Sequence, residues 1–287
     1  MLLEVKNLIT RFYQDENIVT AVNNISFSIE EGKTFCIVGE SGSGKSITSL
    51  SIMGLIDKTG KIDSGEIIFN GENLRRLSER QMRNIRGRQI AMIFQEPMTS
   101  LNPSFTVGYQ IDEALKLHQK NLTKTQRKTK VIESLEMVGI KNPEQKYSSH
   151  PFKLSGGQRQ RVMIAMAMVC KPKLLIADEP TTALDVTIQA QVLDLMKNLQ
   201  KETGTAILFI THDLGVVYDI ADDVAVMYRG EILERNDAKT LFKNPQHPYT
   251  KALLGSIPRP GKIARKSRLA TIDENINYLN FPKVNCG

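Results

Sequence analysis

Short apolar runs recur along the chain, and two patterns among them predict strands. Residues 3–8 and 25–29 alternate apolar and polar side chains, which is typical of a strand with one buried face. Four continuous apolar runs instead fit strands that are buried on both faces, as in a parallel sheet covered by helices. They span residues 34–38, 90–94, 173–177 and 206–210.

Helical spacing fills much of the sequence between these runs. The segment from about 97 to 165 is helical and polar in pattern and is interrupted by prolines, which predicts a helical insert between two halves of a sheet. Helices are also predicted from Ile47 onward, over the arginine-rich residues 72–90 and over 187–202. After about residue 240 the apolar content falls while proline and basic residues increase, so we place a domain boundary there.

The apolar run 34–38 leads directly into a glycine-rich loop that is followed by a helical pattern. The loop matches the phosphate-binding pattern G-x4-G-K-S in full. It consists of Gly39, Glu40, Ser41, Gly42, Ser43, Gly44, Lys45 and Ser46. Backbone N–H groups of such a loop converge on phosphates, and the helix N-terminus adds positive potential. We therefore expect ATP here, with Lys45 on the β- and γ-phosphates and the Ser46 hydroxyl on Mg²⁺.

Two carboxylates follow the apolar run 173–177. Asp178 is placed to help hold Mg²⁺, and Glu179 is the candidate general base for the attacking water. An apolar run that ends in Asp-Glu is a weak signal by itself. Combined with the phosphate loop, it predicts an ATP-hydrolysing site.

Composition and charge narrow the class of protein. Of the 287 residues, 41% are apolar, and the longest dense apolar run, 162–170, is far shorter than the ~20 residues that a membrane span needs. The first six residues are too charged for a signal peptide, so we expect a cytosolic protein unless a partner holds it at a membrane.

The formal charge of +7 is concentrated in residues 241–287, which carry eight Lys or Arg against Asp273 and Glu274. This basic tail is either solvated or in contact with anionic lipid or a partner.

The three cysteines have no spacing that suggests a disulfide or a metal site. Cys36 lies in an apolar strand pattern and Cys170 ends an apolar helical pattern, so both are expected to be small buried side chains. Cys286 is the only cysteine of the tail. A structural metal is therefore not expected.

Taken in order, the motifs resemble those of ABC-type nucleotide-binding subunits. They are Gln95, Leu154 to Gln158, Asp178 and Glu179, Ala183 to Asp185, and His212. The resemblance implies an α/β fold with a RecA-like P-loop core, an antiparallel β subdomain and an α-helical insert at about 97–165. The ATPase domain would span residues 1–240, followed by a short C-terminal extension over 241–287.

The same resemblance assigns roles to these residues. Ser155, Gly156, Gly157 and Gln158 would form a signature that caps the γ-phosphate of ATP held by the opposite subunit. Gln95 would couple Mg²⁺ and the attacking water to the helical insert, Asp185 would lie at the dimer seam, and His212 would contact the γ-phosphate.

An aromatic residue near the N-terminus usually stacks on adenine in this family. Phe12 is the first candidate and Tyr13 the second, with simple core packing as the alternative.

Three longer strings narrow the resemblance to ATPase subunits of dipeptide, oligopeptide and nickel importers. They occupy residues 94–103, 181–191 and 247–254. The implied function is ATP hydrolysis that powers import of di- or oligopeptides, with nickel or metal chelates and glutathione as alternative solutes. Longer relatives carry a cysteine-rich segment that can bind an iron–sulfur cluster, which the single Cys286 cannot form within this tail.

The implied partners are two transmembrane permease subunits, a second ATPase subunit and an external solute-binding protein, without nucleic acid. The second ATPase subunit would be a different chain, with a homodimer as the alternative. The subunit would be peripheral, at the cytoplasmic face of the cell membrane. Two rivals fit less well. A soluble ABC ATPase that acts on DNA or ribosomes usually has two cassettes in one chain or a long coiled-coil insert, and this chain shows one cassette without sustained heptads. A non-catalytic regulatory subunit would have a degenerate Glu179, His212 or signature, and none is degenerate here.

Overall fold

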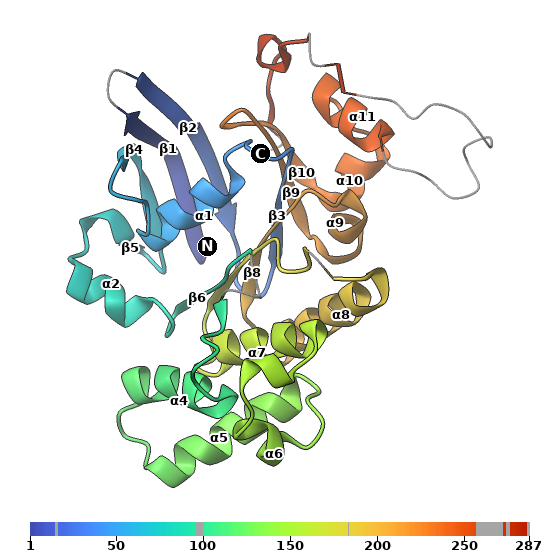
Figure 1. Cartoon of the computed structure of the whole chain (residues 1–287). Coiled ribbons are helices and arrows are strands. Elements are labelled where there is room, and N and C mark those ends of the chain that lie inside the picture. The colour runs from blue at the N-terminus through green and yellow to red at the C-terminus, as the bar shows by residue number, and fades with distance from the viewer. Residues whose placement is uncertain (15–16, 96–99, 183, 257–271, 274–275, 286–287) are drawn as a thin grey trace. The chain divides into compact units, whose positions relative to one another are not determined.

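The computed structural model of the chain describes residues 1–14, 17–95, 100–182, 184–256, 272–273 and 276–285. Figure 1 shows the helices and strands of the chain, which folds into two compact units. Unit 1 comprises residues 1–29, 34–75 and 209–287, and unit 2 comprises residues 30–33 and 76–208. None of the helices in the described residues has both the length and the apolar character that a membrane-spanning segment requires.

Unit 1 contains an antiparallel sheet with the strand order β2-β1-β4-β5. These strands are β1 (Leu3–Gln14), β2 (Asn17–Ile29), β4 (Gly60–Phe69) and β5 (Glu72–Asn73). Leu3 lies between Ile29 of β2 and Phe69 of β4, and these three side chains are buried. The apolar positions of the alternating pattern therefore form one buried face of this sheet.

Unit 1 also contains the strand that precedes the phosphate loop. β3 (Thr34–Val38) is buried along its whole length and pairs in parallel with β9 (Asp223–Tyr228). β10 (Glu231–Asp237) returns antiparallel to β9, and β11 (Val284–Asn285) pairs in parallel with β10. Unit 1 also contains the helices α9 (Leu214–Ile220), α10 (Ala238–Lys243) and α11 (Pro248–Gly255).

Unit 2 contains the second parallel pair. β6 (Ile90–Ile93) lies beside β7 (Leu174–Asp178), with Ile90 opposite Leu174 and Ile93 opposite Ala177. β8 (Ala206–Thr211) begins in unit 2 and ends in unit 1. Every residue of β7 and β8 is buried, as expected of strands covered on both faces.

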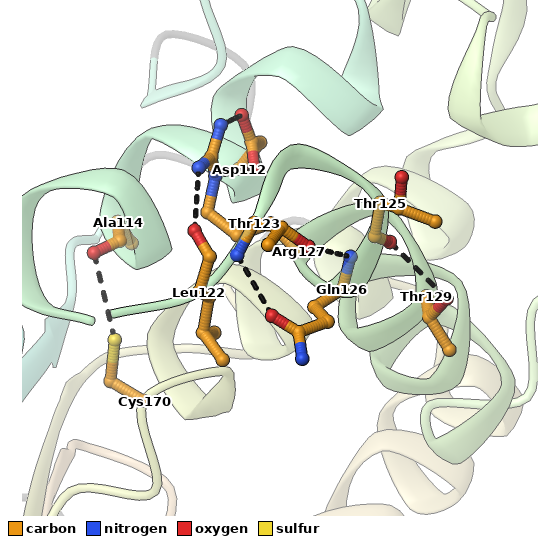
Figure 2. Close-up of polar contacts among 9 residues, drawn as sticks. All are labelled: Asp112, Ala114, Leu122, Thr123, Thr125, Gln126, Arg127, Thr129 and Cys170. Carbon is orange, nitrogen blue, oxygen red and sulfur yellow. Dashed lines mark hydrogen bonds and ion pairs between the residues drawn. The ribbon is translucent and has the colours of Figure 1, made fainter. Parts of the chain in front are cut away.

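Helices make up most of unit 2. They are α2 (Glu79–Ile85), α4 (Val107–His118), α5 (Lys124–Met137), α6 (Pro143–Tyr147), α7 (Gly156–Met168) and α8 (Val186–Thr203). Arg127 of α5 binds Asp112 of α4 through two hydrogen bonds, of 2.7 Å to Oδ1 and 3.4 Å to Oδ2 (Figure 2). The start of α5 is fixed by a capping box in which Thr123 and Gln126 each bind the other's backbone N–H. The bidentate pair makes the contact between α4 and α5 geometrically specific.

The structure confirms the P-loop core with a parallel sheet and an antiparallel β subdomain. It corrects two details. The helix expected over 72–90 is limited to Glu79–Ile85, because Ser78 caps its start and Arg86 leaves the helical conformation. Cys36 is fully buried, but Cys170 is half-buried, because it lies in the turn after α7, where its Sγ is 3.8 Å from the Ala114 carbonyl (Figure 2).

Candidate functional site

The phosphate loop of unit 1 connects the buried end of β3 to α1 (Lys45–Met53). Two of its glycines are required by close backbone approaches. A Cβ on Gly39 would collide with the carbonyl of Met227, and a Cβ on Gly44 would collide with the carbonyl of Ala21. Gly44 also has a φ of 102°, which lies in the left-handed region that favours glycine. The loop is therefore held close to strands β2 and β9 at both of its ends.

Lys45 is the first residue of α1 and is buried inside the loop. Its Nζ donates hydrogen bonds of 2.9 Å to the carbonyl of Gly39 and 2.8 Å to the carbonyl of Glu40. A buried ammonium at this point gives the loop a fixed positive charge. The loop backbone thus holds the cation that we expect to meet a triphosphate.

The N-terminus of α1 is arranged to bind an anion. Gly44 makes no side-chain cap to this helix, and the first turn carries the positive end of the helix dipole. A cavity of about 550 Å³ adjoins the loop and is lined from Glu40 to Ser43, with Tyr228, Arg229, Ile272 and Asp273 on its other sides. The loop therefore combines backbone donors, helix polarity and open space.

The two aromatic candidates for adenine stacking lie next to each other on β1, also in unit 1. Phe12 is half-buried, and its ring packs so closely on Gly60 that a Cβ there would lie 2.8 Å from Phe12 Cε1. Tyr13 is 43% exposed, and its hydroxyl donates a 2.8 Å hydrogen bond to Asp63. That hydrogen bond raises the pKa of Tyr13. Both rings are accessible, and Tyr13 is the one whose position is fixed by a polar partner.

His212 is exposed and follows β8 directly. The next residue, Asp213, caps α9 by accepting hydrogen bonds from Gly215 N–H at 2.8 Å and Val216 N–H at 3.4 Å. Its own N–H donates to Thr211 at 3.0 Å. This local framework fixes the backbone on both sides of His212, which lies in unit 1 with the phosphate loop.

In unit 2, the two carboxylates lie where β7 ends. Asp178 is the last residue of the strand and is 4% exposed, whereas Glu179 is half-buried. Glu179 has a φ of 46°, a left-handed conformation that is uncommon for a residue with a side chain. Strained backbone of this kind is common at functional sites, where it aims a side chain in a fixed direction.

Gln95 and Thr182 hold the carboxylate of Glu179. Gln95 Nε2 donates to Glu179 Oε2 at 3.2 Å, and Thr182 Oγ1 donates to the same oxygen at 3.0 Å. The structure thus brings together the predicted residues Gln95 and Glu179, which are 84 positions apart. Thr182 had not been singled out from the sequence, although it lies within the string 181–191.

The signature residues form the exposed N-terminus of α7. Ser155 and Gln158 make a capping box: the serine Oγ accepts from Gln158 N–H at 3.3 Å, and Gln158 Oε1 accepts from Ser155 N–H at 3.2 Å. A Cβ on Gly156 would meet open space, whereas one on Gly157 would lie 2.9 Å from Ile188 of α8. At Gly156 the exposed end of α7 therefore leaves room for a group to approach the backbone.

Two further contacts tie the signature helix to its surroundings in unit 2. Gln160 is fully buried, and its Nε2 donates a short hydrogen bond to the carbonyl of Pro180, directly after Glu179. Asp185 is exposed and caps α8 by accepting from Ile188 N–H at 2.9 Å. Gln160 was missed in the sequence because nothing local distinguishes it from a solvated helix residue. Ala183 lies outside the described residues.

Comparison with known proteins identifies the family to which these motifs belong. The family described as "ABC transporter" matches residues 22–182, and the family "Oligopeptide/dipeptide transporter, C-terminal region" matches residues 233–286. The chain is 54% identical over 258 residues to the dipeptide transport ATP-binding protein DppD of Bacillus subtilis, covering 90% of this chain and 77% of that protein. It is 55% identical over 258 residues to the oligopeptide transport ATP-binding protein OppD of the same organism, covering 90% and 72%.

Among solved structures, the chain resembles MJ0796, a bacterial ABC transporter cassette determined as a dimer. The TM-score is 0.74 at 28% sequence identity, and the match covers 83% of this chain and 99% of the cassette. A second dimeric structure of MJ0796, in a post-hydrolysis state with ADP and Pi, matches equally well.

Proposed function

The chain belongs to the ABC transporter ATP-binding proteins of the dipeptide/oligopeptide family, and we propose that it is the subunit whose ATP hydrolysis drives uptake of di- or oligopeptides. The family assignment makes it an ABC transporter ATPase. The observation that carries the choice of solute is the identity of 54–55% to named dipeptide and oligopeptide transport proteins. The match of residues 233–286 to the C-terminal region of such transporters supports the same choice.

The chain's own residues have distinct roles in this proposal. Lys45 and the backbone donors from Gly39 to Ser46 bind the phosphates of ATP, and Phe12 or Tyr13 stacks on the adenine. Glu179 accepts a proton from the attacking water, and His212 contacts the γ-phosphate. The two hydrogen bonds to Glu179 support this role, because they orient the carboxylate before the water arrives. Catalysis of this kind relies on positioning and on stabilising charge.

Mg²⁺ fits the residues proposed to hold it. Ser46, Gln95 and Asp178 offer hydroxyl, amide and carboxylate oxygens, which are the donors that Mg²⁺ prefers. Asp178 is a buried carboxylate, and a nearby cation would offset the cost of burying its charge. When bound, the ion would neutralise negative charge on the phosphates.

We further propose that the active form pairs two ATPase subunits. Ser155, Gly156, Gly157 and Gln158 would face the ATP held by the partner, and Asp185 would lie at the seam. The exposure of the signature and of Val186, which is 84% exposed beside Asp185, supports a surface that a partner covers. The partner would be a different ATPase chain, with a second copy of this chain as the alternative.

The remaining partners follow from the same proposal. Two permease subunits would bind this chain at the cytoplasmic face of the membrane, and an external solute-binding protein would deliver the peptide. Nucleic acid has no part in this cycle. Nickel or metal chelates and glutathione remain the alternative solutes.

The test is to purify the assembled transporter with its solute-binding protein and to identify the bound solute by mass spectrometry. Adding that solute should then stimulate ATP hydrolysis by the reconstituted complex. Bound peptides that stimulate hydrolysis would support the proposal. A bound metal chelate or glutathione would reassign the solute, and hydrolysis that no solute stimulates in the complex would contradict a role in import.

A further inference from the structure

The second half of the C-terminal extension packs on unit 1. Its described residues return to β10, where Val284 pairs with Glu234 in a parallel register. Lys283 forms an ion pair of 2.5 Å with Glu231, and Tyr278 is only 3% exposed. Tyr278 and Val284 therefore differ from a solvated tail, because aromatic rings bury the tyrosine and β10 pairs with the valine.

The rings belong to four residues from separate parts of unit 1. They are Tyr228 at the end of β9, Tyr249 of α11, and Tyr278 and Phe281 of the extension, and we call them the ring cluster. The centroid distances are 4.7 Å between Tyr228 and Tyr249, 5.2 Å between Tyr249 and Tyr278, and 6.4 Å between Tyr278 and Phe281. Contacts at these distances stabilise a fixed arrangement of aromatic side chains.

The ring cluster lies directly against the phosphate loop. Tyr228 lines the same cavity as residues Glu40 to Ser43. Two residues later, Gly230 N–H donates a 2.9 Å hydrogen bond to the carbonyl of Ser43. Burial and the negative charge of nearby Glu40 raise the pKa of Tyr249, while a polar contact with the Glu40 backbone, outside normal hydrogen-bond geometry, acts in the opposite direction.

The hydroxyl of Tyr249 is buried without a hydrogen bond. The side chain is 0% exposed, and its oxygen makes no hydrogen bond of normal geometry with any described residue. Ser43 Oγ in the facing loop is in the same state. Buried hydroxyls without partners destabilise a fold and are rare in proteins. A small movement of the loop would supply the missing partner, and nucleotide binding is the event expected to move it.

We propose that Tyr249 is a positioning residue for the phosphate loop: when nucleotide binds, its hydroxyl accepts a hydrogen bond from Glu40 N–H, and the ring cluster holds Tyr249 in place for that contact. The proposal rests on ATP binding at this loop. Under this proposal the C-terminal extension affects the affinity for nucleotide indirectly, because Tyr278 supports Tyr249 without touching the phosphates.

The variant Tyr249→Phe separates this role from packing, because it removes only the oxygen. If Tyr249 only packs, loss of an unpartnered buried hydroxyl leaves the melting temperature equal or higher and ATP affinity unchanged. Under the proposal, the melting temperature of the nucleotide-free protein is equal or higher, whereas the Kd for ATP rises about fivefold, which corresponds to one net hydrogen bond. Thr250→Val is the matched control, since it removes another unpartnered buried hydroxyl from the same helix. It should leave ATP affinity unchanged.

A double-mutant cycle tests the support given by the extension. Tyr278→Leu should weaken ATP binding in the wild-type background and have little further effect in the Tyr249→Phe background, because both changes remove the same contact. Calorimetry on the full chain measures each Kd, with Lys45→Ala as the check that the titrated site is the phosphate loop. An ATP Kd for Tyr249→Phe within twofold of wild type would overturn the proposal, as would equal weakening by Thr250→Val. Absence of ATP binding by the wild-type chain would instead refute the proposed function.

Discussion

Gln95 donates a hydrogen bond from its side-chain amide to the carboxylate of Glu179, with 3.2 Å between Nε2 and Oε2. The same carboxylate oxygen accepts from Thr182 at 3.0 Å, and the Glu179 backbone is in the left-handed region. The side chain is therefore oriented by two donors and by its own backbone. A general base needs this kind of fixed orientation toward its water.

Glu179→Gln should retain ATP binding and lose nearly all turnover. The amide has the same shape and can still accept from Gln95, but it cannot take a proton from water, and a general base typically contributes about 10²–10⁴-fold to the rate. Phosphate release and ATP affinity measure the two properties. Thr182→Val is the control, because it removes only one of the two hydrogen bonds and should cost less than about tenfold. Turnover of the glutamine variant within twofold of wild type would remove Glu179 from the role of base.

The variant Lys45→Ala should bind ATP more weakly than the wild-type protein. The variant removes a buried cation that the loop holds through the carbonyls of Gly39 and Glu40. Because hydrogen bonds to charged groups are worth about 1.5–3 kcal/mol, we expect the Kd for ATP to rise at least about tenfold. Lys58→Ala changes an exposed lysine of unit 1 and serves as control. Calorimetry showing unchanged affinity for the Lys45 variant would contradict the assignment.

Ser155→Arg should block hydrolysis at the ATP site of the partner subunit. The serine caps the exposed N-terminus of α7 next to Gly156, where a side chain would meet open space. An arginine there would fill the surface proposed to approach the partner's γ-phosphate. The variant is paired first with a wild-type partner and then with one unable to hydrolyse ATP at its own phosphate loop. Activity that is lost only at this chain's own loop would refute the composite site.

Phe12→Ala should weaken binding of ATP more than binding of inorganic triphosphate. Stacking of a base on an aromatic ring is worth about 1–3 kcal/mol, and triphosphate has no base. Tyr13→Ala is the direct comparison, since its ring is the more exposed and its hydroxyl is bound to Asp63. A selective loss in the Tyr13 variant alone would make Tyr13 the stacking residue. Equal weakening of both ligands by Phe12→Ala would point to damaged packing.

The parts of the site that could be predicted from the sequence are those made by neighbouring residues. Gly39 to Ser46 form a strand–loop–helix unit whose conformation is local, and Ser155 and Gln158 cap one helix three positions apart. The contact between Gln95 and Glu179 depends on topology. They follow β6 and β7, and these strands are parallel neighbours, so their carboxyl ends lie side by side. The sequence pattern predicts both strands but not that they are adjacent.

The contacts of Tyr249 and Tyr278 could not be predicted from the sequence, because they depend on packing between segments that are distant in the chain. Tyr249 lies in the string 247–254, which indicated family membership without indicating a contact with the phosphate loop. Tyr278 comes from an extension whose charge suggested a solvated segment. Charge and hydropathy average over a segment, whereas burial of one aromatic ring depends on the particular surface it meets. The position of Cys170 shows the same limit, because a helix end can expose what its pattern predicts to be buried.

The capping box of α7 has a consequence for the chemistry of its serine. Capping uses a lone pair of Ser155 Oγ to accept from Gln158 N–H, so the hydroxyl proton is not consumed by the helix. One side chain can therefore end a helix and still donate outward. Substitutions at this position can therefore separate the two hydrogen bonds. Threonine can still accept one bond and donate the other, aspartate can accept but has no proton to donate, and alanine can do neither. Defects in the fold and defects in turnover should then separate along that series, so that the folding role of the serine can be measured apart from the role proposed for it in hydrolysis.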